Sequence, residues 1–381
     1  MKKLKKRKLR ILHLITSLDK GGAQKNLLNI CSSCEIKSFV ICLSKKSYFS
    51  KKLDEIGVDN LSLEINLKNL FSIFKLFKII KILNSFKPDI IQTWLYHADF
   101  IGSIIKLIYK KYKLIWTIRH SDVSLAENKL TTFLLIRLLI TISYKLPDKI
   151  VYCAKASIFA HERIKYCRGK RILIHNGLDI NNKDYINYQF SKDNEEFKLS
   201  NDTFIFISVA RFHPIKNHFL LLNAFKDAKN VSSRKIHLLM LGENIVLGNK
   251  EINDFIKINN LYKNITLLGP KDNVYHYLKK AHFFILSSNS EAFPNVLLES
   301  SLCCTPCIST NVGDAKYIIG KYGYITTKNN RSEMKKAILK ASELSQLDYE
   351  NLAIKTRERS IELFSYERMI SKYNSLYLNL F

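Results

Sequence analysis

Two acidic residues eight positions apart, Glu291 and Glu299, are the first candidates for chemistry in this chain of 381 residues. Glu291 follows an apolar run typical of a strand, and Pro294 marks the start of a helix that contains Glu299. The spacing predicts similar helix azimuths for both carboxylates, which are good acceptors for vicinal sugar hydroxyls. The exposed amides of Asn295 and Val296 can bind phosphate or sugar oxygens. On spacing alone, two unrelated surface glutamates explain the pattern equally well.

Two cations, Arg211 and Lys216, follow the apolar segment Thr203–Ala210. That segment is typical of a buried strand, and a helical pattern begins directly after Lys216. Two cations beside a helix N-terminus can neutralise a diphosphate, because both the charges and the exposed N–H groups favour an anion. A solvated loop with two unrelated charges accounts for this segment equally well.

Smaller signals lie in the first half of the chain. Gly21 and Gly22 follow the first strand and open a helix, where their N–H groups can approach a phosphate, although a plain tight turn is an equal explanation. His120, preceded by Arg119, ends another strand, and this position favours a functional histidine over a structural one. His97 ends the strand before it and is either part of a site or merely the start of a helix.

Apolar, β-rich runs alternate with helical patterns along both halves of the chain. Helices are expected between the strands, among them Gln24–Cys34 and Asn69–Ser85. In the first half the predicted strands are Ile11–Ser17, Phe39–Leu43, Asp89–Trp94, Lys113–Ile118 and Lys149–Cys153. In the second half they are Thr203–Ala210, Ile236–Leu241, Asn264–Leu268, Phe283–Leu286 and Cys307–Thr310.

This alternation predicts an α/β protein with two Rossmann-like, doubly wound domains, each with a parallel sheet buried on both faces. We place the first domain at residues 1–185 and the second at 195–364, with a helix near 365–381 that packs back on the first. Ligands of such sheets bind beyond the carboxyl ends of the strands, so the expected site is a cleft between two facing domains. Neither half carries a complete G-x-G-x-x-G fingerprint, which argues against a dehydrogenase.

Basic residues outnumber acidic ones, 61 to 33, for a formal net charge of +28. Residues 1–180 contain 34 of the basic and 13 of the acidic residues. Such a field favours nucleic acid, an anionic membrane surface or diphosphate ligands, although a lysine-rich surface that keeps the protein soluble explains any single lysine as well. The segment Leu70–Phe86 is apolar with Lys75, Lys78 and Lys81 on one side, which is typical of a helix at a membrane interface or of a core helix with a lysine edge.

No segment reaches the roughly 20 apolar residues that span a bilayer. The start MKKLKKRKLRILHLITSL has no small-residue cleavage site, so we interpret it as a basic arm that leads into a strand and not as a signal peptide. The eight cysteines include two CxxC pairs. These pairs lie roughly 270 residues apart, far beyond zinc-finger spacing, so reduced and buried thiols are expected.

The candidate residues belong to segments that resemble glycosyltransferase family 4, whose members are retaining GT-B enzymes. Glu291–Glu299 with the following Ser300–Pro306 resembles the E-x7-E signature of that family. The resemblance runs in order along essentially the whole chain, and its other segments are Ile11–Ala23, Ile174–Asp179, Val209–Arg211 with Lys216–Asn217, and Phe364–Glu367. Ala292 departs from the family, which usually has glycine there, and its methyl group puts the loop conformation and the choice of donor in question.

The resemblance implies a second domain that binds a nucleotide sugar and a first domain that binds the acceptor. Glu299 is similar to the ribose-binding glutamate, and Glu291 to the glutamate beside the donor sugar. Arg211 and Lys216 resemble the diphosphate clamp, and His120 resembles the cleft histidine near the transferred sugar. The acceptor side is assigned His97 and Arg119. The remaining donor-site assignments are Gly21, Gly22, Leu268 with the stretch to Lys271, Phe293, Asn295 and Val296.

The implied reaction moves a hexose or N-acetylhexosamine from a nucleotide diphosphate sugar, expected to be a UDP-sugar, with retention at the anomeric carbon. No carboxylate is placed as a nucleophile, so a same-face displacement is favoured, driven by charge neutralisation and positioning. No D-x-D pair is present, so no metal or other cofactor is expected. The expected acceptor is a glycan carried on a polyprenyl diphosphate, and the expected location is cytoplasmic, on the inner face of the cell membrane.

Two other functions remain open at this stage. A GT-B nucleotide-sugar epimerase would release nucleotide without an acceptor. A basic nucleic-acid-binding protein is compatible with the charge, but no recognition motif supports it, so no nucleic-acid partner is expected.

Overall fold

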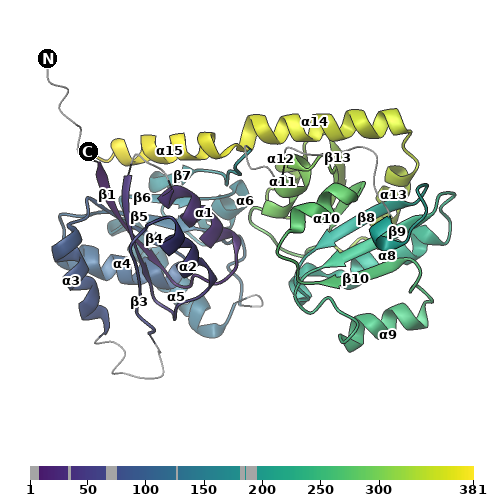
Figure 1. The fold of residues 1–381 in the computed structure, drawn as a ribbon. Coiled ribbons are helices and arrows are strands. Elements are labelled where there is room, and N and C mark those ends of the chain that lie inside the picture. Colours follow the sequence, from purple (N-terminus) through teal and green to yellow (C-terminus); the bar gives the residue numbers. More distant parts are fainter. Residues whose placement is uncertain (1–7, 33–35, 66–74, 126–127, 181–184, 186–194) are drawn as a thin grey trace, which may run out of the picture. The chain divides into compact units, whose positions relative to one another are not determined.

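The computed structural model describes residues 8–32, 36–65, 75–125, 128–180, 185 and 195–381 (Figure 1). The basic arm as far as residue 7, residues 70–74 of the predicted lysine-edged helix, most of the polar linker and Cys34 lie outside these ranges. The chain divides into two compact units: unit 1 comprises Met1–Gly177 with Tyr366–Phe381, and unit 2 comprises Leu178–Ser365.

Unit 1 contains a seven-stranded sheet in the order β3-β2-β1-β4-β5-β6-β7, in which every pairing is parallel. Its strands are β1 (Leu9–Ile15), β2 (Ile36–Cys42), β3 (Asn60–Ser62), β4 (Ile90–Trp94), β5 (Lys113–Ile118), β6 (Lys149–Tyr152) and β7 (Arg171–Leu173). Its helices are α1 (Gly22–Cys31), α2 (Tyr48–Glu55), α3 (Phe77–Phe86), α4 (Tyr96–Ile108), α5 (Leu130–Lys145), α6 (Lys155–Arg163), the 3-10 turn η2 (Arg168–Lys170) and α15 (Tyr366–Leu378).

Both faces of this sheet are covered because side chains along each strand alternate between the two faces. In β1, Ile11 and Ile15 pack with residues of α1, α2 and α15, while Leu12 and Leu14 pack with residues of α3, α4 and α5. The C-terminal helix α15 therefore belongs to the core of unit 1, to which it contributes Met369, Tyr373, Leu376 and Tyr377.

Unit 2 contains a six-stranded parallel sheet in the order β10-β9-β8-β11-β12-β13. Its strands are β8 (Phe204–Val209), β9 (Ile236–Leu241), β10 (Ile265–Gly269), β11 (Phe283–Leu286), β12 (Cys307–Thr310) and β13 (Gly323–Thr326). Its helices are η3 (Glu195–Phe197), η4 (Pro214–Lys216), α8 (His218–Lys229), α9 (Lys250–Ile258), α10 (Val274–Lys280), α11 (Asn295–Leu302), α12 (Ala315–Ile319), α13 (Arg331–Ser342) and α14 (Gln346–Phe364).

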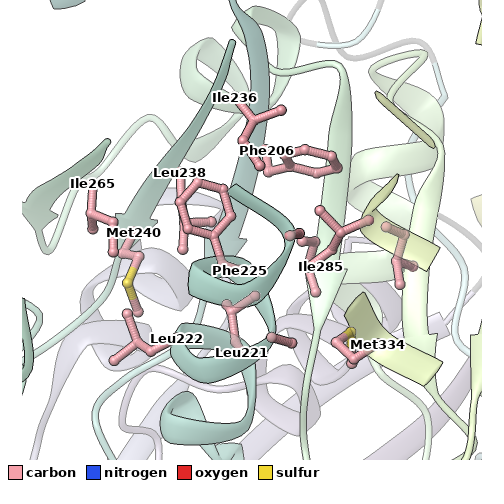
Figure 2. Packing of buried hydrophobic residues seen from close by; sticks show 14 of the residues in the cluster. Phe206, Leu221, Leu222, Phe225, Ile236, Leu238, Met240, Ile265, Ile285 and Met334 are labelled. Atoms are coloured by element: carbon pink, nitrogen blue, oxygen red, sulfur yellow. The ribbon is translucent and has the colours of Figure 1, made fainter. Parts of the chain in front are cut away.

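The core of unit 2 lies between its sheet and the helices α8 and α13 (Figure 2). Phe206 of β8 and Leu238 of β9 pack against Leu221 and Phe225 of α8, and Met334 of α13 joins them; all five side chains are fully buried. This apolar core holds β8 and β11 in place, so the loops that follow these strands start from fixed positions.

The α/β class predicted from the alternation is confirmed in both units. All ten predicted strands are present within a few residues of their expected bounds, and three short strands, β3, β7 and β13, were not predicted. The predicted helix Asn69–Ser85 is observed, within the described residues, as α3 after a single 3-10 turn. No helix among the described residues is long and apolar enough to cross a membrane.

The described cysteines are all free, and all but Cys167 are buried. Burial raises the pKa of the Cys31 thiol and of the Cys307 thiol to about 12. Both groups are therefore protonated at neutral pH, as is typical of structural thiols.

Candidate active site

The order of strands in unit 2 reverses between β8 and β11. β9 and β10 extend the sheet on one side of β8, whereas β11, β12 and β13 extend it on the other. The loops after β8 and β11 leave the same edge of the sheet in opposite directions, and a crevice at such a switch point is the usual ligand site of an open α/β sheet. Arg211 and Lys216 lie in the first of these loops, and Glu291 lies in the second.

An ion pair joins the two loops. The Nζ atom of Lys216 lies 2.6 Å from Oε1 of Glu291, and the two side chains are 23% and 16% exposed. Ser288 donates a second hydrogen bond, of 2.7 Å, to the same carboxylate oxygen. The Glu291 carboxylate is thus held from two sides, and the Lys216 ammonium keeps further N–H donors for a ligand oxygen because an ammonium has three.

Backbone contacts hold the two loops in register. The Ser287 hydroxyl donates to the carbonyl of Lys216 at 2.9 Å, and the amide of Asn289 donates to the carbonyl of Ile215 at 2.7 Å. The Asn217 side chain donates to the amide oxygen of Asn289 at 3.0 Å and also caps α8 by accepting from the amide of Leu220. Sequence reasoning missed Ser287 and Asn289 and named Asn217 only as part of the family resemblance, because their partners are more than 70 positions away.

Two glycines, Gly242 and Gly313, lie in close contact with the backbone of these loops. A Cβ atom on Gly313 would lie 2.3 Å from the carbonyl oxygen of Ala292 and 2.5 Å from that of Glu291, and Gly313 has a φ of +54°. A Cβ atom on Gly242 would lie 2.1 Å from the carbonyl oxygen of Ala210. Both positions require glycine, since any side chain would displace the backbone that carries Glu291 or Arg211.

Arg211 is exposed, whereas Lys216 is half-buried. The carbonyl of Arg211 lies 3.0 Å from Nε2 of His218, which anchors the start of the loop to α8. Among the described residues, no carboxylate pairs with the Arg211 guanidinium within 4 Å. The guanidinium is therefore available to an anionic ligand at this edge of the sheet.

Helix α11 begins beside the second loop. Its N-cap is Pro294, which provides no side-chain cap, so the first amides of the helix, at Asn295 and Val296, lie at a site suited to an anion. Glu299 is half-buried in the second turn of α11. The azimuth argument made from the sequence is wrong, because α11 begins at Asn295 and Glu291 lies in the preceding loop.

The other predicted donor-site residues occupy different environments. Leu268 lies at a bulge near the carboxyl end of β10, at the same edge of the sheet as Arg211. The Phe293 ring is 7% exposed and packs edge-on against Phe364 at 5.5 Å between centroids, so it anchors the loop. Gly21 and Gly22 lie in unit 1, where Gly21 caps α1 in an extended conformation.

In unit 1, His97 and His120 follow the carboxyl ends of β4 and β5. His120 reaches solvent and stacks on Tyr96 with 5.9 Å between ring centroids, while the protein around it lowers its pKa through desolvation. His97 is half-buried, and desolvation lowers its pKa as well. Both imidazoles are therefore neutral at pH 7 and suited to hydrogen bonding with an uncharged hydroxyl.

Arg119 has a structural environment. Its guanidinium donates to the side chains of Asn176 and Tyr373, the latter at 3.2 Å, and lies 4.7 Å from the ring centroid of Trp94. These contacts connect the end of β5 with Asn176, near the end of the Met1–Gly177 segment, and with α15. The predicted acceptor contact of Arg119 is untested, but the side chain has a clear role in holding α15 on unit 1.

A buried polar cluster behind His97 was not predicted. Asp99 is fully buried, accepts a hydrogen bond from Thr93 at 2.5 Å, and has a pKa raised well above its ordinary value by desolvation. Beside it, the Tyr96 hydroxyl lies 2.9 Å from Nε2 of the buried His161. The cluster supports the start of α4 through buried hydrogen bonds. Within the described ranges, no group of three or more His, Cys, Asp or Glu residues is placed to hold a metal ion.

Two parallel α/β units with this order of elements define the GT-B fold, and solved structures share it across nearly the whole chain. Anabaena HepE in complex with UDP superposes with a TM-score of 0.84 at 18% identity, covering 97% of this chain and 99% of that one. A glycosyltransferase from Rickettsia africae superposes with a TM-score of 0.81 at 20% identity, covering 98% of each chain. At these identities the likeness establishes the fold.

The family model for glycosyl transferases group 1 matches residues 189–359, which include both loops of the site. The matched residues lie within the second unit, and the match agrees with the family-level resemblance seen in the sequence.

Curated relatives agree with this placement. An N-acetylgalactosamine-N,N'-diacetylbacillosaminyl-diphospho-undecaprenol 4-alpha-N-acetylgalactosaminyltransferase of Campylobacter jejuni is 31% identical over 207 residues, which are 53% of this chain and 52% of that protein. The N-acetyl-alpha-D-glucosaminyl L-malate synthase of Bacillus anthracis is 27% identical over 206 residues, 52% of this chain and 51% of that protein. The chain thus spans about half the length of these curated relatives. A longer match, to the capsular polysaccharide biosynthesis glycosyltransferase CapH of Staphylococcus aureus, is 24% identical over 318 residues and covers 80% of this chain and 82% of that protein.

Proposed function

We propose that this protein is a retaining hexosyltransferase that moves a hexose or N-acetylhexosamine from a UDP-sugar to a glycan acceptor carried on a polyprenyl diphosphate. The observation that carries the proposal is the Lys216–Glu291 pair, which joins the loops at the β8–β11 switch point of unit 2. In this pair a cation lies next to a carboxylate that can accept hydrogen bonds from sugar hydroxyls. Both lie at the edge of the sheet where such folds bind nucleotides.

Lys216, Arg211 and the N-terminus of α11 provide positive potential for the diphosphate of the donor. Negative charge grows on this group as the bond to the anomeric carbon breaks, so these groups stabilise the transition state more than the bound substrate. In this proposal they supply the charge neutralisation that a metal ion would otherwise supply.

Glu291 is proposed to orient the sugar and Glu299 the ribose, each by accepting hydrogen bonds from hydroxyl groups. Glu291 already accepts from Lys216 and Ser288, and these contacts favour a positioning role over that of a covalent nucleophile. The acceptor oxygen then attacks from the face that the diphosphate leaves, which retains the anomeric configuration. Its proton passes to an oxygen of the departing diphosphate.

The names of two relatives support this choice of substrates. The Campylobacter relative is named for transfer to a diphospho-undecaprenol-linked sugar. An Escherichia coli relative, 23% identical over 189 residues, is named a UDP-Gal:alpha-D-GlcNAc-diphosphoundecaprenol galactosyltransferase. An acceptor of this kind lies in a membrane, so we propose that the protein works in the cytoplasm, at the inner face of the cell membrane.

The first test is nucleotide binding. UDP and UDP-sugars should raise the melting temperature more than GDP- or ADP-sugars do, because a ligand that binds only the folded state stabilises it by about 2.7 kcal/mol at a hundred times its Kd. Glu299→Ala should weaken the shift, whereas Glu350→Ala, which removes a half-buried glutamate of α14, should not. The absence of any shift at millimolar UDP, GDP or ADP would contradict the donor site.

The second test separates transfer from epimerisation. With a UDP-sugar and a polyprenyl-diphosphate-linked acceptor, transfer should form a glycoside of the same anomeric configuration as the donor, which NMR of the product identifies. UDP should be released only when the acceptor is present. Release of free UDP and an epimerised sugar without an acceptor would favour the epimerase.

A further inference from the structure

Several exposed apolar side chains lie on helices α3 and α4 of unit 1. Phe77 on α3 is 60% exposed, and Ile104, Leu107 and Ile108 on α4 are 40%, 57% and 66% exposed. Single exposed apolar residues are common, but a contiguous group of them marks an interaction surface.

The two helices enclose an apolar groove. It has a volume of 260 Å³, and its lining consists entirely of Leu, Ile, Phe and Tyr side chains, including Phe77, Ile80, Ile104 and Ile108. Ile79 and Leu83 of α3 and Ile105 of α4 line the groove and also belong to the core of unit 1, so the groove opens directly over that core. Its apolar lining is suited to a hydrocarbon chain.

Exposed lysines lie on or next to the same two helices. On α3, Lys78 and Lys81 are exposed, and Lys110 and Lys111 are exposed directly after α4. Residues 75–113 contain eight lysines and two aspartates.

Of the two aspartates, Asp99 is buried and Asp89 lies outside both helices, between the end of α3 and the start of α4. Asp99 is fully buried, so its carboxyl group lies away from the outer surface, and desolvation raises its pKa well above the ordinary value. Asp89 is half-buried and accepts a hydrogen bond of 2.8 Å from the backbone amide of Arg10. The surface is therefore apolar at its centre and positive at its edge.

We propose that this α3–α4 surface, formed by Phe77, Ile80, Ile104, Leu107 and Ile108 with Lys78 and Lys81 beside them, inserts into an anionic lipid bilayer. The hydrocarbon chain of a lipid enters the groove, and the lysine ammonium groups lie at the level of the phosphates. Two copies of the chain packed through this surface would bring like charges together, which disfavours self-association relative to an anionic membrane. The inference rests on the proposed function only in that an acceptor on a lipid has to be reached at a membrane.

The test is co-sedimentation with vesicles of phosphatidylglycerol and phosphatidylcholine, against phosphatidylcholine alone. The wild type should bind the anionic vesicles, and salt should weaken this binding without abolishing it. The double variant Lys78→Glu/Lys81→Glu should lose about tenfold or more in affinity at low salt. The double variant Ile104→Glu/Ile108→Glu should lose the binding that persists at high salt.

A matched control is Phe159→Glu on α6, since Phe159 is 70% exposed in the same unit but lies outside the surface. It should bind like the wild type. Insertion is read directly with Phe77→Trp: Trp94 and Trp116 are fully buried, so lipids brominated on their chains should quench the new indole selectively.

Three results would overturn the proposal: equal binding to neutral and anionic vesicles, an equal loss in Phe159→Glu, or a Phe77→Trp indole that brominated lipids do not quench. A dimer in light scattering that dissociates in the Ile104→Glu/Ile108→Glu variant would assign the surface to a second copy instead. The UDP-dependent rise in melting temperature should be the same in every variant. Loss of that rise in the wild type would count against the donor site and not against the membrane surface.

Discussion

The carboxylate of Glu291 and the ammonium of Lys216 come from loops 75 positions apart and meet at 2.6 Å. Neither group is fully exposed, so their interaction is less screened than that of a surface pair. Surface pairs of the same chain, such as Lys235 with Asp202 at 3.3 Å and 68% and 64% exposure, lack this environment. This difference in exposure distinguishes Lys216, a candidate site residue, from the solvated lysines of a lysine-rich chain.

We predict that Lys216→Ala and Glu291→Ala each lower kcat/KM by about 100-fold or more, because each removes charge stabilisation or sugar positioning in the transition state. The melting temperature should change little, since the core of unit 2 is apolar and includes neither side chain. Steady-state kinetics and a thermal melt of the same samples measure both effects.

Lys235→Ala is the control for this prediction, as it removes an exposed lysine from an ion pair of the same unit and should leave kcat/KM unchanged. Near-normal turnover in Lys216→Ala or in Glu291→Ala would contradict the assigned roles. Loss of folding in both variants would show that the pair is structural.

At the scale of elements, the site depends on where β8, β11 and β12 end. Parallel pairing brings the carboxyl ends of these strands to one edge of the sheet, and the loop after β12 supports the loop after β11. The amide of Asp314 donates to the carbonyl of Ala292 at 3.0 Å, and Gly313 leaves no room for a side chain beside it. The position of Glu291 is thus set partly by a loop that contains no predicted site residue.

Gly313→Ala should therefore displace the backbone that carries Glu291. We expect kcat/KM to fall by more than about tenfold, because a 1 Å displacement of a positioning residue has effects of this size or larger. The positive φ should add about 1 kcal/mol of destabilisation, which corresponds to a small drop in melting temperature. Gly248→Ala is the matched control in unit 2, since its Cβ atom would meet nothing closer than 3.9 Å. Equal kinetics in the two variants would refute the role of Gly313.

At the scale of the whole molecule, both units contain buried neutral histidines. Desolvation lowers the pKa of His13 to about 3 and the pKa values of His161 and His237 to about 4. His13 and His161 lie in unit 1, and His237 lies in unit 2. Each ring has a hydrogen-bond partner, namely Trp94, Tyr96 and Thr266.

These groups predict acid sensitivity in both units. The pKa in the folded state lies below the value near 6.5 of the unfolded chain, so the unfolded state binds more protons between about pH 6.5 and pH 4. The free energy of unfolding should therefore have its full value above about pH 6.5. At lower pH it should decrease, by up to about 1.4 kcal/mol per pH unit for each histidine. Urea unfolding at pH 5 and pH 7 measures this loss, and His237→Gln should reduce its slope in unit 2. A stability that does not change over this range would contradict the prediction.

Much of the fold follows from local pattern. Buried strands such as β9 and β11 are continuous apolar runs, and their bounds were predicted to the residue because every position faces a covered side of the sheet. The short strands β3, β7 and β13 have half-buried side chains, so they lack the apolar signal that identifies a strand. Edge strands of this kind form because a neighbouring strand offers unpaired backbone groups.

The sequence by itself determined the residue types of the candidate site: two cations after one strand, two glutamates around a helix start, and the order of segments that resembles the family. Only the tertiary structure decided that Lys216 and Glu291 meet, that Gly242 and Gly313 support their loops, and that α3 and α4 enclose an apolar groove. The physical reason is the range of the interactions involved. Strand and helix patterns reflect neighbours in the chain, whereas ion pairs, close backbone contacts and grooves form between segments that only the packing of the sheet brings together.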